Sequence, residues 1–180
     1  MDNKSVLVVM DIQEGFFGKN SKLPIKNENK NKFLNGISEL IDAWMTNKNE
    51  VVYVKTVYGK WTPLNFFTKS AVKDGTKGID LIDSIYRNGC PIFEKHSTNV
   101  FTNKDFEKYL LNGQFKNVVI CGVFAEYCVN QAAIGAKKKE FNVFVVKDLI
   151  GYRNRKKFNL FLERMKKNEI YIVEGKDVPS

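Results

Sequence analysis

Three residues that could act together in nucleophilic chemistry each lie at or just beyond a short apolar run. Asp11 follows VLVVM, Lys95 follows PIFE, and Cys128 comes shortly after VVICGV. A thiol with a free pKa of about 8.5 is mostly protonated near neutral pH, so a nucleophilic cysteine needs a base and a nearby cation. Asp11 could accept the proton and Lys95 could favour the thiolate, with help from the positive end of the helix that begins near Cys128.

The apolar runs that precede these residues alternate with amphipathic segments. Short, continuous apolar runs are typical of strands that are covered on both faces. The runs predict strands at Val6–Met10, Val51–Val57, Pro91–Glu94, Val118–Val123, Asn142–Val146 and Ile170–Val173. This alternation favours a parallel sheet with helices on both faces. Ligands of such sheets bind beyond the carboxyl ends of the strands, which is where the three residues would meet.

Apolar residues at helical spacing predict the connecting helices. The predicted helices are Asn31–Asn47, a helix capped by Thr102 or Asn103 and ended by Asn112-Gly113, Ala125–Lys138, and a last helix marked by Phe158, Leu160, Phe161 and Met165.

Residues 58–90 interrupt the alternation of strands and helices, because this long stretch contains only a short and weak helical pattern. Loops of this length in compact domains are usually functional or disordered, and the aromatic residues disfavour disorder. We expect the stretch to cover a substrate. Trp61 is a candidate pocket residue, although Trp61 and Phe66 could instead belong to the fold or to an oligomer contact.

Composition bounds the remaining possibilities. A chain of 180 residues with 43% hydrophobic content predicts one domain over residues 1–180, and no apolar run approaches the roughly 20 residues that span a bilayer. Three cysteines without a C-x-x-C pair suit a reducing compartment, so we expect a cytoplasmic protein. The net charge of +9 comes from lysines scattered among acidic residues. This pattern favours a solvated surface over a nucleic-acid partner, and it would also suit an anionic small substrate.

Three motifs carry a resemblance to a known superfamily. They are MDIQEGFF at 10–17, EKHSTNVF at 94–101 and CGVFAEYCVNQAA at 121–133. In order and spacing they resemble the isochorismatase-like cysteine hydrolases, which include nicotinamidases and N-carbamoylsarcosine amidohydrolase. The pattern of that family runs D-x-Q-x-x-F, K-x-x-x-S-A-F and G-V-x-T-D-x-C-V-x-x-T-A, so the likeness covers nearly the whole chain.

The resemblance implies a catalytic triad of Asp11, Lys95 and Cys128. It also implies a cis peptide bond between Val123 and Phe124, and an oxyanion hole formed by the backbone N–H groups of Phe124 and Cys128. The implied activity is hydrolysis of a C–N bond in a small amide, ureido or carbamoyl compound through a thioacyl intermediate.

The implied fold is a three-layer α/β/α doubly wound sheet of six parallel strands in the order 3-2-1-4-5-6. Gln13 and Phe16 match positions that shape the pocket floor and wall in the family. Relatives form oligomers, so the resemblance implies a homo-oligomer, with aromatic residues of a neighbouring chain helping to close the pocket.

Departures from the family pattern affect what we expect of metal binding and of substrate choice. Nicotinamidases carry a metal-binding Asp-x-His after the second strand, whereas VKTVYGKWTPLNFF contains neither Asp nor His. We therefore expect no metal and no cofactor. Asn99 and Val100 replace the usual Ser and Ala, and Ala125 and Glu126 replace the usual Thr and Asp. Asn99, Ala125 and Glu126 are expected to border the pocket and to influence substrate choice.

Several alternatives remain open from the residues alone. Cys128 could be an inert buried thiol, and His96, the single histidine, could serve as the base of a Cys-His pair. Cys121 is expected to pack inside a strand, and Cys90 has no assigned role. Within the same fold, a vinyl-ether hydrolase that needs no thiol nucleophile and a catalytically silent binding protein are the competing functions.

Overall fold

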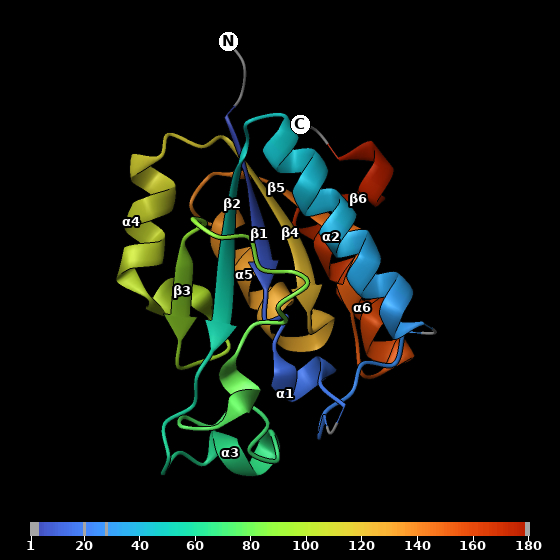
Figure 1. Cartoon of the computed structure of the whole chain (residues 1–180). Coiled ribbons are helices and arrows are strands. Elements are labelled where there is room, and N and C mark those ends of the chain that lie inside the picture. The colour runs from blue at the N-terminus through green and yellow to red at the C-terminus, as the bar shows by residue number, and fades with distance from the viewer. Residues whose placement is uncertain (1–3, 20, 28, 179–180) are drawn as a thin grey trace.

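A six-stranded parallel sheet organises the chain. The computed structural model describes residues 4–19, 21–27 and 29–178. The strands lie in the order β3-β2-β1-β4-β5-β6 (Figure 1), and every pair is parallel, as the sequence and its resemblance predict. The strands are β1 Ser5–Met10, β2 Glu50–Thr56, β3 Ile92–Lys95, β4 Asn117–Val123, β5 Asn142–Gly151 and β6 Tyr171–Val173.

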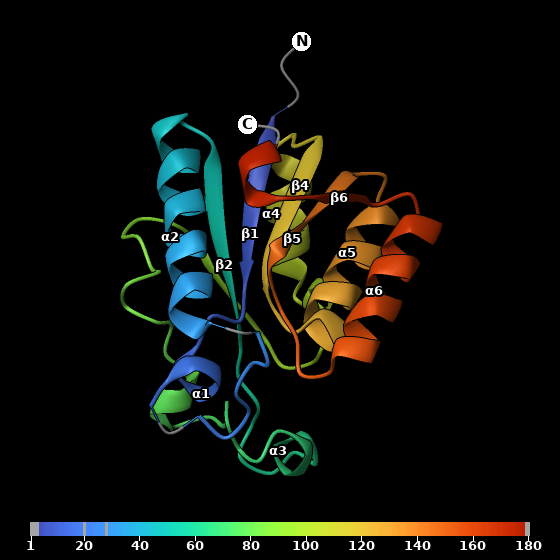
Figure 2. The same cartoon turned by 90° about the vertical axis from the view of Figure 1, so that its right-hand side faces the viewer.

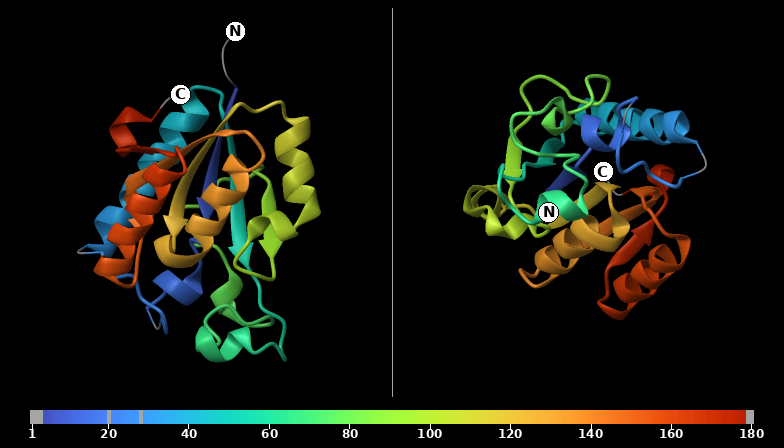
Figure 3. Two further views of the ribbon diagram at one scale, coloured as in Figure 1. Left: turned by 180° about the vertical axis from the view of Figure 1, so that it is seen from behind. Right: turned by 90° about the horizontal axis from the view of Figure 1, so that it is seen from below.

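Helices cover both faces of the sheet (Figure 2, and Figure 3 from behind and below). One face packs against α2, Lys30–Thr46, whose apolar stripe is buried from Phe33 to Trp44. The other face packs against α4 Lys104–Asn112, α5 Asn130–Lys137 and α6 Arg155–Lys167. Because the two central strands are covered on both sides, every residue of β1 and β4 is buried, which explains their continuous apolar sequences.

Asparagine side chains begin three of these helices. Those of Asn29, Asn103 and Asn154 accept hydrogen bonds from backbone N–H groups in the first turns of α2, α4 and α6. The sequence predicted either Thr102 or Asn103 as the cap of the helix that ends before Gly113, and the structure shows Asn103. Short helices complete the chain: α1 Glu14–Phe17, α3 Leu64–Phe67, η1 Lys77–Ile79, η2 Val100–Thr102, η3 Ala125–Val129 and η4 Gly175–Asp177.

Two elements differ from the prediction. The expected helix Ala125–Lys138 begins as a π-helical turn, η3, before continuing as α5. Strand β5 extends beyond its apolar run to Gly151, because a shift in register after Ile120 lets β4 pair with Ile150 and Gly151. The charged residues in the second half of β5 are tolerated since that half lies at the edge of the sheet, beyond the short β6.

The segment 58–90 begins beyond the carboxyl ends of the strands, at the bottom of Figure 1, and its last part runs back over the α2 face of the sheet to the start of β3. There the Tyr53 hydroxyl donates to the Ile85 carbonyl, and Arg87 pairs with Asp42 of α2. The segment is held by isolated bridges, Gln13 to Leu81 and Tyr58 to Lys73, and by the buried side chain of Ile85. The Asn65 side chain donates to the Gly59 carbonyl at 2.8 Å and closes the turn that carries α3. Among the described residues, no helix is long and apolar enough to cross a membrane.

Candidate active site

Asp11, Lys95 and Cys128 meet at the carboxyl edge of the sheet. Asp11 directly follows β1 and adopts a left-handed backbone conformation, φ 56°, which an aspartate tolerates better than most residues. Lys95 ends β3, two strands away, and its long side chain reaches back across the end of β2. Cys128 lies in η3, which follows β4, the other neighbour of β1.

The three side chains are in direct contact. The Lys95 Nζ lies 3.1 Å from the Cys128 Sγ and 3.1 Å from the Asp11 Oδ2. Lys95 and Asp11 have side-chain exposures of 0% and 1%, and Cys128 is 8% exposed. Burying an ion pair this completely costs several kcal/mol per ion unless partners compensate, so the arrangement is costly for stability alone and is typical of a functional site.

Thr56, the last residue of β2, links the acid to the ammonium. Its hydroxyl donates to the Asp11 Oδ1 at 2.9 Å and accepts a hydrogen bond from the Lys95 Nζ. The sequence analysis did not select Thr56. The rule that found the other residues, a polar side chain at a strand end, applies to the end of the second strand equally well.

Burial and charge set the resting protonation state. Burial and the Asp11 carboxylate raise the pKa of the Cys128 thiol to about 12, although Lys95 acts in the opposite direction. Burial disfavours the Lys95 ammonium, yet the charge of Asp11 and the interactions with Cys128 raise the pKa of that lysine overall. The resting site is therefore a neutral thiol beside an aspartate–lysine ion pair, because a free thiolate would leave one uncompensated buried negative charge.

One atom of the cluster is placed to take the thiol proton. The Asp11 Oδ2 is buried and accepts no hydrogen bond from the described residues, although the Lys95 ammonium faces it. A proton that passes from sulfur to this oxygen leaves the net charge of the site unchanged. Proton transfer within the pair thus avoids the charge penalty that opposes simple ionisation of the thiol.

The Cys128 thiol opens onto a pocket of about 280 Å³. Its lining consists of Phe16, Leu23, Thr56, Tyr58, Leu64, Phe67, Thr68, Thr98, Phe124, Tyr127, Cys128 and Arg153. The rings of Phe16 and Phe124 pack edge to face, with centroids 5.1 Å apart. Burial raises the pKa of Tyr58 to about 12, so this pocket phenol stays protonated. The pocket suits a small, partly apolar molecule presented to the thiol.

Phe16, which was predicted for the pocket, lines it, and so does Phe124, which was predicted to supply an oxyanion N–H. The peptide bond between Val123 and Phe124 is cis, as the resemblance implied. The long segment after β2 also contributes to the wall, through Tyr58 and Phe67 among others.

Five other residues predicted for the pocket are not among those that line it. Trp61 is 97% exposed and does not line the pocket. Asn99 caps the η2 turn by accepting from the Phe101 N–H at 3.0 Å. Gln13 is buried beneath the site, where its amide donates to the Thr56 carbonyl at 2.9 Å and accepts from the Thr56 N–H at 2.8 Å.

The last two, Ala125 and Glu126, line a separate hollow of about 180 Å³ beside α6. The π-helical element η3 orients both side chains away from the pocket, whereas Tyr127 and Cys128 of the same element line it. The Glu126 Oε1 accepts the N–H groups of Arg153 and Asn154, at 2.8 and 2.7 Å. Arg153 and Thr98 also line the pocket and were not predicted to do so; Thr98 lies within the EKHSTNVF motif, and Arg153 follows the observed end of β5 at Gly151.

The remaining cysteines and the histidine take other positions. Cys121 is fully buried in β4, and Cys90 is half-buried in the loop before β3; both are free thiols. The His96 Nδ1 lies 2.7 Å from the Val57 carbonyl oxygen, so this ring nitrogen donates to the backbone. The Cys128 thiol lies 3.1 Å from the Lys95 Nζ and also interacts with the Asp11 carboxylate.

The residues at the end of β2 do not fit a metal site of the nicotinamidase kind. Thr56 and Tyr58 stand there, and the described part of the chain has no group of three or more His, Cys, Asp or Glu that could hold a metal ion. We derive no metal-dependent step. The expectation of a metal-free enzyme stays a prediction.

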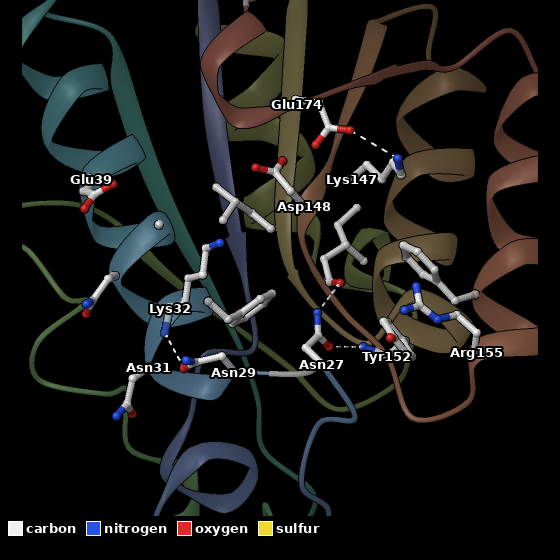
Figure 4. Close-up of a pocket in the computed structure, with 16 residues that line it drawn as sticks. Asn27, Asn29, Asn31, Lys32, Glu39, Lys147, Asp148, Tyr152, Arg155 and Glu174 are labelled. Atoms are coloured by element: carbon white, nitrogen blue, oxygen red, sulfur yellow. Dashed lines mark hydrogen bonds and ion pairs between the residues drawn. The ribbon is translucent and has the colours of Figure 1, made fainter.

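A second, larger hollow of about 930 Å³ lies between α2, the free edge of β5 and the start of α6 (Figure 4). Most of its lining residues are polar or charged, although Phe33, Leu149, Ile150 and Phe158 also line it. The Asn27 side chain bridges the Ile150 carbonyl and the Tyr152 N–H, and Lys147 pairs with Glu174 at 3.2 Å. We call this hollow the polar groove. Neither cysteine nor histidine lines it, and its charged side chains are exposed or partly exposed.

Comparisons with known proteins agree with the fold. The family model for the isochorismatase domain matches residues 5–177. The secreted isochorismatase effector Isc1 of Verticillium dahliae is 26% identical over 151 residues, which is 83% of this chain and 74% of that protein. The N-carbamoylsarcosine amidase of Thermoplasma acidophilum superposes with a TM-score of 0.84 at 21% identity, covering 98% of this chain and 99% of that one. The nicotinamidase/pyrazinamidase PncA of Bacillus subtilis gives 0.83 at 20% identity, covering 95% and 100%.

Proposed function

Because this chain belongs to the isochorismatase family, we propose that it is a cysteine hydrolase that cleaves a C–N bond in a small amide, ureido or carbamoyl compound. The observation that carries the proposal is the buried contact of Cys128 with Lys95 and of Lys95 with Asp11 at the floor of an apolar pocket. Each group has a task in amide hydrolysis that its position allows it to perform.

The first half-reaction forms a thioester. The Cys128 sulfur attacks the carbonyl carbon while its proton passes to the Asp11 Oδ2, so the site stays neutral overall. The N–H groups of Phe124 and Cys128 stabilise the oxyanion. Asp11 then protonates the leaving nitrogen, the C–N bond breaks, and ammonia or an amine departs. Lys95 remains positive throughout and favours the thiolate at the moment of attack.

The second half-reaction restores the enzyme. Asp11, now a carboxylate again, removes a proton from a water molecule that attacks the thioester. The C–S bond breaks, the acid product leaves, and the thiol regains its proton. Thr56 keeps the carboxylate oriented toward the sulfur in both halves by its hydrogen bond to the Asp11 Oδ1.

Selective alkylation tests the nucleophile. We expect iodoacetamide at pH 6–7 to modify Cys128 faster than Cys90 or Cys121, because Asp11 can accept the Cys128 proton whereas the other two thiols have no such base. Peptide mapping by mass spectrometry measures the three rates in one molecule. Equal or slower modification of Cys128 would contradict the proposal. A panel of small amides and ureides, assayed for ammonia with and without a chelator, then tests the bond type and the metal-free mechanism.

The curated relatives favour a second candidate, hydrolysis of an isochorismate-like vinyl ether, because they are named isochorismatase effectors. That reaction needs no thiol nucleophile. Isochorismate turnover that persists after Cys128→Ala would support it and would remove the amidase proposal.

We also propose a cellular compartment and an oligomeric state for the protein. We propose a cytoplasmic homo-oligomer, on the basis of three free thiols and of the exposed Trp61, Phe66 and Phe67 beside the pocket. The relatives are named as secreted, so cell fractionation is the direct test of compartment. Light scattering of the purified protein tests assembly, and a monomer at micromolar concentration would contradict it.

A further inference from the structure

One hydroxyl in the pocket above Cys128 has no partner within the described part of the chain. Tyr58 lies two residues beyond β2, is 4% exposed and lines the pocket. Its hydroxyl forms no hydrogen bond with any residue that the structure describes. Nearly all buried polar groups in folded proteins are hydrogen-bonded, so an unpaired hydroxyl in the wall of a pocket indicates a group that pairs with a ligand.

Tyr53, in β2 itself, shows how the same part of the fold satisfies a buried phenol. It is 0% exposed, its hydroxyl donates to the Ile85 carbonyl at 2.8 Å, and the same oxygen accepts the Arg87 N–H at 3.2 Å. Both partners belong to the segment 58–90 that begins with Tyr58. This segment therefore pairs the phenol outside the pocket and leaves unpaired the phenol that lines it.

Hydrogen bonds on both sides of the backbone fix the position of Tyr58. Its N–H donates to the Val72 carbonyl at 2.9 Å, and its carbonyl accepts the Asp74 N–H at 2.8 Å, on either side of the bridge to Lys73. The ring packs in the core cluster that also contains Phe16. Because the backbone is tied and the ring is packed, the hydroxyl is preorganised, and a ligand that binds it loses little free energy to ordering.

The phenol is a neutral donor close to the proposed triad. Burial raises the pKa of Tyr58 to about 12, and the charges of Cys128, Lys95 and Asp11 also act on it. The phenol is therefore protonated near neutral pH and lies within electrostatic range of all three groups. A substrate atom that pairs with this hydroxyl lies close to the bond that Cys128 attacks.

The threonine hydroxyls of the pocket are less suited to this task. Those of Thr56 and Thr68 already donate, to the Asp11 carboxylate at 2.9 Å and to a backbone carbonyl at 2.8 Å. Thr98 is half-buried, so water can reach it. Among the described hydroxyls that line the pocket, Tyr58 is thus the buried one whose proton remains for a ligand.

We propose that Tyr58 determines specificity by donating a hydrogen bond to an uncharged acceptor on the substrate, a carbonyl oxygen or a ring nitrogen close to the scissile carbonyl. The inference rests on the proposed function, since Cys128 must define where that carbonyl lies. A ligand without an acceptor covers the phenol and leaves it unpaired, which costs free energy. The pocket therefore rejects the apolar analogue of its substrate, and its volume of about 280 Å³ limits both to small molecules.

Matched alkylating amides test the inference without a known substrate. N-(Pyridin-3-ylmethyl)iodoacetamide and N-benzyliodoacetamide differ only by a ring nitrogen in place of a C–H group, and both are uncharged at pH 7.5. The 2- and 4-pyridyl isomers place the nitrogen at the other positions of the ring. With each reagent the Cys128 sulfur displaces iodide, an S–C bond forms, and the thiol proton passes to Asp11. Labelling of Cys128 is measured relative to Cys90 in the same molecule, which corrects for the intrinsic reactivity of the reagents.

We expect at least one pyridyl isomer to be preferred over the benzyl reagent by about three- to tenfold, the contribution of one neutral hydrogen bond. The preference should not change at high salt, because the interaction involves no net charge. The absence of a preference for any isomer overturns the proposal. A preference that disappears at high salt indicates a charged partner in place of the phenol and overturns it as well.

Tyr58→Phe assigns the preference, because it removes the hydroxyl and keeps the ring that packs in the core. This variant should bring the pyridyl and benzyl reagents to equal relative rates. Tyr127→Phe is the matched control, since Tyr127 also lines the pocket but is 43% exposed, where water satisfies its hydroxyl; this variant should keep the preference. A preference that survives Tyr58→Phe, or that is lost in Tyr127→Phe alone, overturns the role of Tyr58.

Two further outcomes separate this role from other tasks of the phenol. Equal slowing of the pyridyl and benzyl reagents in Tyr58→Phe, with the preference retained, would show that the hydroxyl acts on the thiol or on the fold, and the specificity role would be wrong. Failure of Cys128 in the native protein to react with any of the reagents would overturn the proposed nucleophile itself, which distinguishes that result from failure at Tyr58.

Discussion

The pocket above Cys128 and the polar groove differ in volume and in the burial of their charged groups, and the two properties point to different hollows. The groove, at about 930 Å³, is over three times larger than the pocket, at about 280 Å³. Its ion pair between Lys147 and Glu174 has side-chain exposures of 46% and 43%, against 0% and 1% for Lys95 and Asp11. An exposed pair of this kind contributes about 0–1 kcal/mol and costs little to form.

The smaller pocket is the one in which the fold buries charged groups at a cost in free energy. A buried ammonium and a buried carboxylate beside a thiol are maintained only by a network in which each member needs the others. A hydrophobic replacement would serve stability equally well, so the network indicates chemistry. The difference between the two hollows therefore teaches that desolvated, mutually dependent charges are better evidence for a candidate active site than size.

Removal of the thiol should give the largest effect. Cys128→Ala and Cys128→Ser are expected to lower ammonia release by at least about 10⁴-fold, since no other group in the pocket can form the thioester. The measurement is an ammonia assay on any amide substrate from the panel, with circular dichroism to show that the fold persists.

The buried thiol outside the site is the matched control. Cys121→Ala should retain most of the amide turnover, because Cys121 packs inside β4 on the face covered by α2. Comparable losses in the Cys128 and Cys121 variants would show that the site of Cys128 is not special.

Asp11→Asn should lower hydrolysis by about 10²- to 10⁴-fold, the usual contribution of a general acid–base group. It should also change how Cys128 alkylation depends on pH. In the native protein, transfer of the Cys128 proton to Asp11 would keep that proton within the pair, whereas its loss to solvent is opposed because burial raises the pKa of the Cys128 thiol to about 12. The alkylation rate should therefore depend only weakly on pH below that value.

Asp11→Asn removes the carboxylate that could accept the Cys128 proton. Alkylation of Cys128 in Asp11→Asn should rise with pH through a single pKa, as for an ordinary thiol, and Cys90 reports that ordinary behaviour in the same sample. Mass spectrometry of quenched reactions measures both rates. A native profile that rises tenfold per pH unit would show that Asp11 does not take the proton.

Strand ends and apolar runs predict much of this site, for reasons that also mark the limit of sequence analysis. Asp11, Lys95 and Cys128 follow apolar runs, and parallel strands end at one edge, so their meeting can be foreseen. The strand order came from the family resemblance, because periodicity does not specify which strands are neighbours. Thr56 lies at a predicted strand end as well and could have been selected by the same rule.

The directions of individual side chains could not be predicted. Glu126 lies two residues before the nucleophile and was expected in the pocket, but a π-helical turn rotates each residue differently from an α-helix and sends it toward α6. Trp61 is exposed although it is large and apolar, because the segment after β2 buries Tyr58 and Ile85 instead. Such choices depend on tertiary packing, which local sequence does not encode.

Breaking the buried ion pair should destabilise the protein far more than breaking the exposed one. Lys95→Met is expected to lower the free energy of unfolding by about 3–5 kcal/mol, because it leaves Asp11 buried without its cation. Lys147→Met, the matched change in the polar groove, should change it by at most about 1 kcal/mol. Urea denaturation at pH 7 measures both.

A second substitution can recover the lost stability. Lys95→Met combined with Asp11→Asn should be less destabilising than the sum of the two single changes, because no uncompensated charge is left in the double variant. Strict additivity would indicate that the two side chains do not depend on each other and would remove the contrast with the groove.

The smallest expected effect lies in the polar groove, at Asp148. Burial and the neighbouring Glu174 raise the pKa of this carboxyl, although the Gly175 N–H opposes the shift by donating to its Oδ1. In the folded protein the group therefore holds its proton to a higher pH than in the unfolded chain. Stability is lost as the pH rises through the raised folded pKa, and the penalty stays constant above it.

Asp148→Asn removes this ionisation while keeping an oxygen that can accept from the Gly175 N–H. The variant should match the native protein at pH 4 and should be more stable at pH 7 by no more than about 0.5 kcal/mol, because the side chain is only partly buried and water screens its charge. Urea midpoints at the two pH values give the comparison. A gain of several kcal/mol would mean that the groove, too, maintains a costly buried charge, and burial of charge would then no longer distinguish the two hollows.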